Sequence, residues 1–122
     1  MHILVTESDR GAAVDVERRL RQGGHTVSRC HDHDAPPFPC VGLCADRRCP
    51  LDSSIPVDAV VTVRAHPYPR PTTWEDGVVC ALRRRVPLVV AGTSALNPYD
   101  AWTAAVADDA DVVEVCDTVM RA

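Results

Sequence analysis

The stretch MHILVTESDRGAAVDVERRLRQGGHTVSR, residues 1–29, contains the clearest strand-helix-strand pattern of this sequence. It opens with a β-favouring run at 2–6 and closes with a second one at 25–29. Between them, apolar residues recur at helical spacing: Ala13, Val16 and Leu20. Ser8 or Asp9 is expected to cap this helix, and the following glycine pair is expected to stop it.

Three later runs of apolar and β-branched residues favour strands, at 58–64, 86–91 and 111–115. Helices are expected at 72–85 and 97–107. Strands that alternate with helices form βαβ units, a parallel sheet and right-handed crossovers. The sequence therefore predicts an α/β fold with one doubly wound, five-stranded parallel sheet.

Both later helices begin with a recognisable signal. Thr72 and Glu75 have the spacing of a capping box, and Asn97 precedes a proline that suits a first helical turn. Cys80 lies in an apolar part of the first of these helices and is expected to pack in the core. Cys116 would end the last strand, at the edge of the sheet where ligands bind in such folds.

Length and composition limit the alternatives. A chain of 122 residues has room for one compact core, so residues 1–122 are expected to form a single domain. The hydrophobic share of 46%, the charged share of 25% and the net charge of -4 are ordinary for a soluble protein. They provide no large positive surface, so direct contact with nucleic acid is not expected.

The cellular compartment decides how the six cysteines are interpreted. The first residues lack the basic and long apolar regions of a secretory signal, and no apolar run approaches the roughly 18 residues of a membrane span. We expect a cytoplasmic protein without membrane contact. In a reducing compartment, clustered thiols bind metal or do redox work, whereas an exported protein would form three disulfides.

Four quoted segments carry a family resemblance: ILVTESD (3–9), RRLRQGGHTV (18–27), VDAVVTVRAHP (57–67) and VPLVVAGTSA (86–95). They resemble response-regulator receiver domains, most specifically over the first 28 residues. The resemblance implies a flavodoxin-like sheet with strand order 2-1-3-4-5. It also implies an acidic Mg²⁺ site and an aspartate that accepts phosphate.

Most of the residues of that phosphorylation site are missing. Glu7 and Asp9 match the acidic pair, and Thr93 matches the family's hydroxyl residue after the fourth strand. Val63, followed by Arg64, stands where the phosphoacceptor aspartate would end the third strand. The family lysine has no counterpart, because the chain contains no lysine. The resemblance therefore implies a degenerate receiver that is not phosphorylated in the usual way.

The segment 30–56 is rich in cysteine and proline and stands where a receiver has its second helix. Within it, only residues 40–46 could form about two helical turns. Four thiolates so close in sequence can hold Zn²⁺ or an iron-sulfur cluster. The predicted metal ligands are Cys30, Cys40, Cys44 and Cys49. His31 and His33 are possible substitutes for a thiolate, although each is more simply a solvated loop residue.

The choice of metal stays open at this stage. Three ligands close in sequence, a more distant fourth and the proline after Cys49 favour an iron-sulfur cluster. Zinc sites more often use two separate cysteine pairs, but a structural Zn²⁺ remains the alternative. The remaining alternative is that these are small, buried cysteines without metal, but their clustering in a proline-rich loop argues against it.

The sequence favours a non-enzymatic regulatory or partner-binding module with a metal or redox switch. A protein partner is expected, and a homodimer is possible. The alternative is a small enzyme or electron carrier that binds a nucleotide or flavin at the strand ends, as flavodoxin-like folds often do. Against this alternative, the sequence has no G-x-G-x-x-G, no P-loop and no nucleophile beside a clear base.

Overall fold

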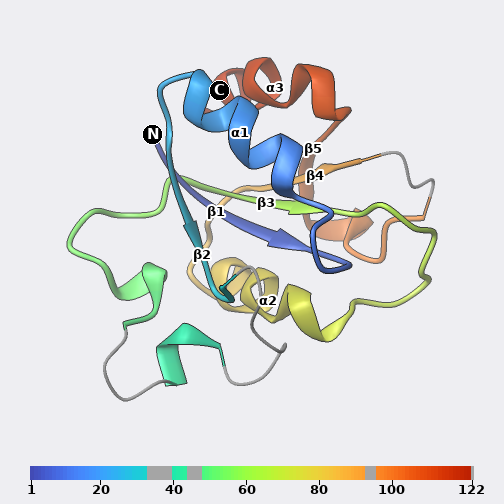
Figure 1. Cartoon of the computed structure of the whole chain (residues 1–122), viewed down its shortest axis with the longest axis horizontal. Coiled ribbons are helices and arrows are strands. Elements are labelled where there is room, and N and C mark those ends of the chain that lie inside the picture. The colour runs from blue at the N-terminus through green and yellow to red at the C-terminus, as the bar shows by residue number, and fades with distance from the viewer. Residues whose placement is uncertain (33–39, 44–47, 93–95, 122) are drawn as a thin grey trace.

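Five parallel strands form one sheet in the computed structural model of the chain, which describes residues 1–32, 40–43, 48–92 and 96–121. The spatial order is β2-β1-β3-β4-β5, as predicted (Figure 1). The strands are β1 (His2–Glu7), β2 (Thr26–Arg29), β3 (Ala59–Val63), β4 (Leu88–Ala91) and β5 (Thr103–Ala107). This order in an α/β arrangement is that of flavodoxin-like folds.

Helices cover both faces of the sheet (Figure 1). The α-helices are α1 (Val14–Gln22), α2 (Asp76–Arg83) and α3 (Val112–Arg121). Helices α1 and α3 lie together on one face, and α2 lies on the other. Among the described residues, single 3-10 turns lie between these elements: η1 (Val41–Leu43), η2 (Pro50–Asp52), η3 (Thr73–Glu75), η4 (Asp100–Trp102) and η5 (Asp109–Asp111).

The alternation of side chains along β1 divides the core into two layers. Ile3 and Val5 pack toward α1 and α3, in a cluster that includes Leu20. Leu4 points to the opposite face and packs with Val78 of α2. All these side chains are almost completely buried, and each contributes roughly 1.5–3 kcal/mol relative to an exposed position.

The N-terminus of α1 differs from the prediction. The helix begins at Val14 after a turn, and its N-cap is Ala13 without a side-chain cap. Gly11 allows this turn, because its φ of +86° is a conformation that other residues rarely adopt. Asp9 is therefore not a helix cap, and its carboxylate is available for other contacts.

The sequence prediction is wrong for the last two elements, where a strand precedes a helix instead of following one. The expected helix at 97–107 is instead η4 followed by β5, and the expected strand at 111–115 lies in η5 and α3. A capping box at Asp108 and Asp111 starts the final helix. Short runs of alanine and valine are compatible with either a helix or a strand. The capping box is the local feature that favours a helix after Asp108.

The capping box at Thr72 and Glu75 is confirmed, and it opens η3, which leads into α2. The segment between β2 and β3 has two 3-10 turns and no α-helix in its described residues. Only residues 41–43 of the expected helix at 40–46 are seen as a turn; residues 44–47 lie outside the described part. In the described residues, no helix is both long and apolar enough to cross a membrane.

Candidate functional site

The carboxyl ends of β1 and β3 lie at one edge of the sheet, where the resemblance places an acidic metal site. Glu7, at the end of β1, is instead bound by the guanidinium of Arg29, which also lies 2.9 Å from a carboxylate oxygen of Glu17. Burial alone would lower the pKa of Arg29, but the hydrogen bonds to these two carboxylates raise it. The Glu7 carboxylate is thus paired within the protein, and it shares the Arg29 guanidinium with Glu17.

Asp9 also has protein partners. Its carboxylate accepts hydrogen bonds from the hydroxyls of Tyr68 and Ser8, at 2.8 and 2.9 Å, and lies 2.8 Å from the Nδ1 atom of His66. Partial burial opposes ionisation of Asp9, yet these hydrogen bonds lower the pKa of its carboxyl below the usual value. Asp9 therefore holds together the loop after β3, rather than pairing with Glu7.

Arg64 fills the position next to that of the phosphoacceptor. Its guanidinium forms an ion pair with Glu75, and both side chains are almost fully buried, at 1% and 0% exposure. The Thr62 hydroxyl donates to the second Glu75 oxygen at 2.7 Å, and Arg64 also donates to the Tyr68 carbonyl at 2.8 Å. Charges that are paired and hydrogen-bonded in this way are stable inside a protein. A buried ion pair thus fills the space after the end of β3.

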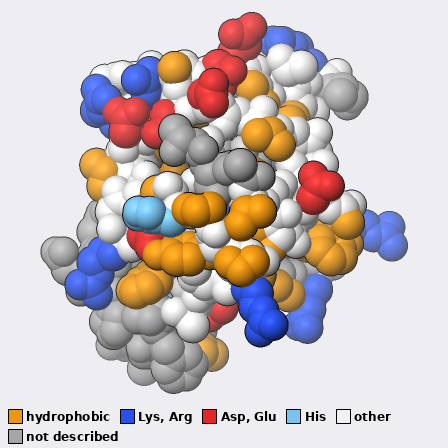
Figure 2. Space-filling view, turned by 90° about the vertical axis from the view of Figure 1, so that its right-hand side faces the viewer, with side chains coloured by type: hydrophobic (Ala, Val, Ile, Leu, Met, Phe, Trp, Pro, Cys, Tyr) orange, Lys and Arg blue, Asp and Glu red, His pale blue; other side chains and the backbone are white. Residues whose placement is uncertain are grey.

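Figure 2 looks onto this side of the molecule. Hydrophobic side chains gather across the middle of the view, and arginine side chains lie around its periphery. The described residues thus present no concentrated positive surface here that would attract a phosphoryl group.

Cys30 follows β2 directly and is the best defined of the predicted ligands. Its side chain is buried against α2 in the same core cluster as Val78. Burial raises the pKa of its thiol from 9.0 to about 12, and the charges of Cys49, Cys40 and Cys80 act in the same direction. The thiol of Cys30 is therefore protonated at neutral pH unless a positive charge compensates for the loss of its proton.

Cys40 and Cys49 lie beside Cys30. The amide of Val41 donates to the Cys30 carbonyl at 2.7 Å, which brings Cys40 and η1 against the end of β2. Cys40 is half-buried and packs against the same core cluster as Cys30. Cys49 precedes η2, and a Cβ atom at Gly42 would come within 2.9 Å of its Cβ. The two short turns therefore touch each other, and they bring three predicted ligands to the α2 side of the sheet.

His31 is buried, unlike the solvated loop residue that the sequence favours. It has 5% exposure, and neither ring nitrogen has a hydrogen-bond partner. Burial lowers the pKa of its imidazole, which favours the neutral form that can bind a metal. Cys44 and His33 lie outside the described residues.

The predicted ligands are neighbours without forming a closed site. Among the residues that the structure describes, no group of three or more histidine, cysteine or acidic side chains could hold a metal ion as placed. The four-cysteine site thus stays a prediction. Cys30, Cys40 and Cys49 are the part of it whose proximity can be described.

The two other cysteines both differ from the prediction. Cys80 is exposed on α2 rather than packed in the core, because the helix turns Val78 and Ala81 inward instead. Cys116 lies in α3, completely buried in the opposite layer of the core, rather than at a strand end. Burial raises the pKa of the Cys116 thiol to about 11, so it is a poor candidate for a reactive group.

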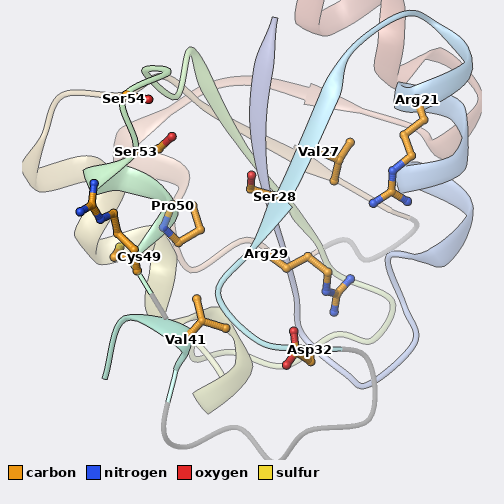
Figure 3. Close-up of a pocket in the computed structure, with 11 residues that line it drawn as sticks. Arg21, Val27, Ser28, Arg29, Asp32, Val41, Cys49, Pro50, Ser53 and Ser54 are labelled. Carbon is orange, nitrogen blue, oxygen red and sulfur yellow. The ribbon is translucent and has the colours of Figure 1, made fainter. Parts of the chain in front are cut away.

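A polar cavity of about 620 Å³ opens between β2 and the two turns (Figure 3). Its lining includes Arg21, Arg29, Arg48, Asp32 and Cys49. In Figure 3, Cys49 and Pro50 lie on one side of the cavity and Arg29 lies on the other. Because Cys49 is on the cavity wall, small solutes can reach this part of the cysteine cluster.

A second, apolar groove of about 440 Å³ lies on the other side of α2. It is lined by Val79, Leu82, Tyr99 and Trp102, among others. Val79 and Trp102 are 47% and 62% exposed, so large apolar side chains face solvent on this side of the molecule.

Comparisons of the chain with protein-family models, with curated proteins and with solved structures find no match.

Proposed function

We propose that this protein is a non-enzymatic regulatory module, related to receiver domains, in which a metal site in the segment after β2 replaces phosphorylation as the switch. The observation that carries the proposal is the gathering of Cys30, Cys40 and Cys49 at the end of β2. The predicted set also includes Cys44, with His31 or His33 as substitutes. An iron-sulfur cluster is the preferred cofactor, and Zn²⁺ is the alternative.

The carboxyl edge of the sheet supports the loss of phosphorylation. A receiver needs an exposed aspartate and a metal-binding acidic pair at this edge. Here Arg64 and Glu75 form a buried ion pair, while Glu7 is paired with Arg29. Adding a phosphoryl group to such an arrangement would require these buried charges to separate, at a cost of several kcal/mol.

The chemistry of the cysteine cluster supports a metal. Thiols bind metal as thiolates, and bound metal supplies the positive charge that a buried thiolate such as Cys30 lacks. The unpartnered nitrogens of His31 are a further potential donor within one residue of Cys30. A bound metal would also order a segment that is rich in proline and has little regular structure of its own.

Access to Cys49 favours a responsive site over a purely structural one. The stability and potential of an iron-sulfur cluster depend on its exposure to solvent and oxidants. The cavity that Cys49 lines would admit such molecules. Loss of the cluster would release the turns η1 and η2 and change the surface that they form.

The apolar groove beside α2 supports a role in partner binding. Contiguous exposed apolar surface marks sites where proteins meet other proteins. Helix α2 borders both this groove and the cysteine cluster, since Val79 lines the groove and Gly77 touches Cys30. A change at the metal site could therefore alter the binding surface through one short helix.

Anaerobic purification tests the proposed cofactor. We expect coloured protein with iron and acid-labile sulfide, or colourless protein with one Zn²⁺ per chain in the alternative. Absorbance and elemental analysis distinguish these results. Protein that folds but holds neither iron nor zinc, even after reconstitution with each metal under reducing conditions, contradicts the proposal.

A further inference from the structure

One face of α2 lies against the cysteine-rich segment. Gly77 and Cys80 are three residues apart in α2, and Arg84 is its C-cap residue four positions further on, so helical spacing places all three along one side. At one end, a Cβ atom on Gly77 would come within 2.6 Å of the Cys30 sulfur. Helix α2 and the end of β2 are therefore in direct contact, with only a glycine between the helix backbone and the thiol.

Arg84 makes the second contact of this face. Its guanidinium donates to the Leu51 carbonyl and to the Asp52 carboxylate, both at 2.6 Å. Leu51 and Asp52 belong to η2, which follows Cys49 directly. Cys80 lies between Gly77 and Arg84 in the sequence, so it is on the side of α2 that meets Cys30 at one end and η2 at the other.

The electrostatics agree with this placement. Beyond burial, the charges that raise the pKa of Cys30 are those of Cys49, Cys40, Cys80 and Asp76, in that order. The pKa of Arg84 is raised mainly by Asp52, and Cys49 and Cys80 add to the effect. Cys40 and Cys49 from the cysteine-rich segment and Cys80 from α2 are thus all close enough to act on the Cys30 thiol.

We propose that Cys80 is a metal ligand, and that the set is Cys30, Cys40, Cys49 and Cys80, with Cys44 outside it. This inference deepens the proposed function and rests on it. It replaces a site contained in one segment by a site that joins that segment to α2. Four thiolates complete the coordination of Zn²⁺ or of an iron-sulfur cluster, so no fifth cysteine is needed.

Closing this site requires the four side chains to turn toward one another, because no metal-holding group exists among the described residues as they are placed. Cys80 is exposed and Cys40 and Cys49 are only half-buried, so their side chains can change rotamer at little cost. Cys30 is fixed by its contact with Gly77 and would be the anchor toward which the others turn. Metal binding provides the energy for this rearrangement, as in other sites where binding and ordering are coupled.

The test compares the wild type with two matched variants, Cys80→Ser and Cys44→Ser, after anaerobic purification. Iron, zinc and acid-labile sulfide are measured per chain, and metal affinity is measured by competition with a chelator. We expect Cys44→Ser to hold metal like the wild type. We expect Cys80→Ser to lose more than the roughly 10- to 100-fold in affinity that loss of an outer-shell partner costs.

Two further measurements make the result specific. After metal removal, Cys80→Ser and the wild type should melt at the same temperature, because an exposed side chain contributes little to the apo fold. In the metal-loaded wild type, Cys80 should resist iodoacetamide while Cys44 reacts, as read by peptide mass spectrometry. Removal of the metal should make Cys80 reactive.

The outcomes separate the inference from the proposed function. Metal that stays bound in Cys80→Ser overturns the inference while the proposed function stands. Metal lost from both variants also overturns it, because Cys44 then belongs to the set. Wild-type protein that binds neither metal overturns the proposed function itself. Loss from Cys80→Ser alone supports both.

Discussion

Individual side chains explain how the end of β3 is filled and why the cysteines differ from one another. Arg64 and Glu75 form a buried ion pair next to the position where the receiver resemblance would place an exposed aspartate. Cys30 and Cys116 are buried thiols with raised pKa values, whereas Cys80 is exposed. The sequence contains all these residues, but the burial of each one depends on how the strands and helices pack against one another.

Thiol reactivity should follow this difference in the metal-free protein. Iodoacetamide reacts with thiolates, so at pH 8 we expect Cys80 to be alkylated well before Cys30 and Cys116. The order is read by mass spectrometry of peptides after increasing reaction times. In denaturant, all three should react at similar rates. Equal rates in the folded protein would contradict the burial described for Cys30 and Cys116.

The ion pair of Arg64 and Glu75 should be essential for stability. Arg64→Met leaves the Glu75 charge buried without its partner, so we expect a loss of about 3–5 kcal/mol in the free energy of unfolding. Urea titration followed by circular dichroism measures this loss. The double variant Arg64→Met with Glu75→Gln should recover part of it, since no charge is then stranded.

Arg18→Ala is a suitable control for this experiment. Arg18 pairs with Asp15 on the surface, where its side chain is 59% exposed. Solvent screens exposed pairs of this kind, so the change in stability should be small beside that of Arg64→Met. A large loss in both variants would show that the effect is not due to burial.

At the scale of elements, the sequence predicted the first four strands and the first two helices well, and it failed at the last strand and helix. β1, α1 and β3 have clear apolar patterns. Gly23 and Gly24 mark the end of α1, and the capping box at Thr72 marks the beginning of η3 and α2. Residues 103–107 have no such marks. The signal for α3 is the acidic capping box at Asp108 and Asp111, which is weaker in sequence than the Thr and Glu pattern that precedes α2.

The candidate site was also predictable only in part, because it depends on contacts between segments that are distant in the sequence. The spacing of cysteines along one segment pointed to Cys30, Cys40, Cys44 and Cys49, but it could not include a residue of a distant helix. Cys80 follows Gly77 and precedes Arg84 at helical spacing, which was visible in the sequence. Its meaning depends on the contact of that helix face with η2, which only the fold reveals.

The contact between Gly77 and Cys30 should control how α2 sits on the sheet. Alanine normally stabilises a helix by about 0.5–1 kcal/mol relative to glycine. At Gly77, the added methyl group would meet the Cys30 sulfur at 2.6 Å, so we expect Gly77→Ala to lose about 1–3 kcal/mol through overpacking. Thermal or urea unfolding of the metal-free protein measures the difference.

A double-mutant cycle isolates this contact. In a Cys30→Ala background the sulfur is absent, so Gly77→Ala should cost less than in the wild type. An equal cost in both backgrounds would assign the effect to Thr6, whose methyl group is the next neighbour at 3.2 Å.

For the whole molecule, the two core layers make stability sensitive to alkaline pH. One buried thiol lies in each layer: Cys30 on the α2 side and Cys116 on the α1 and α3 side. Their pKa values in the folded protein are about 12 and about 11, against 9.0 for an unperturbed thiol. The unfolded chain therefore loses these protons at a lower pH than the folded protein does.

The metal-free protein should be fully stabilised by these thiols below pH 9 and should lose that contribution as the pH rises toward 12. Each unit of pKa difference corresponds to about 1.4 kcal/mol, so the loss should reach a few kcal/mol. Urea unfolding at a series of pH values measures it. Cys116→Val, which keeps an apolar side chain there, should show a smaller decline, and an identical decline would contradict the assignment.

The close approach of Gly77 to Cys30 also predicts a pattern of paired substitution in related sequences. A sulfur at one position leaves no room for a side chain at the other, although the two are far apart in the sequence. Chains of common ancestry that keep the cysteine should keep the glycine, and those that lose the cysteine become able to carry alanine in α2. Paired substitution at these two positions would therefore distinguish true relatives from proteins that merely share a cysteine-rich segment.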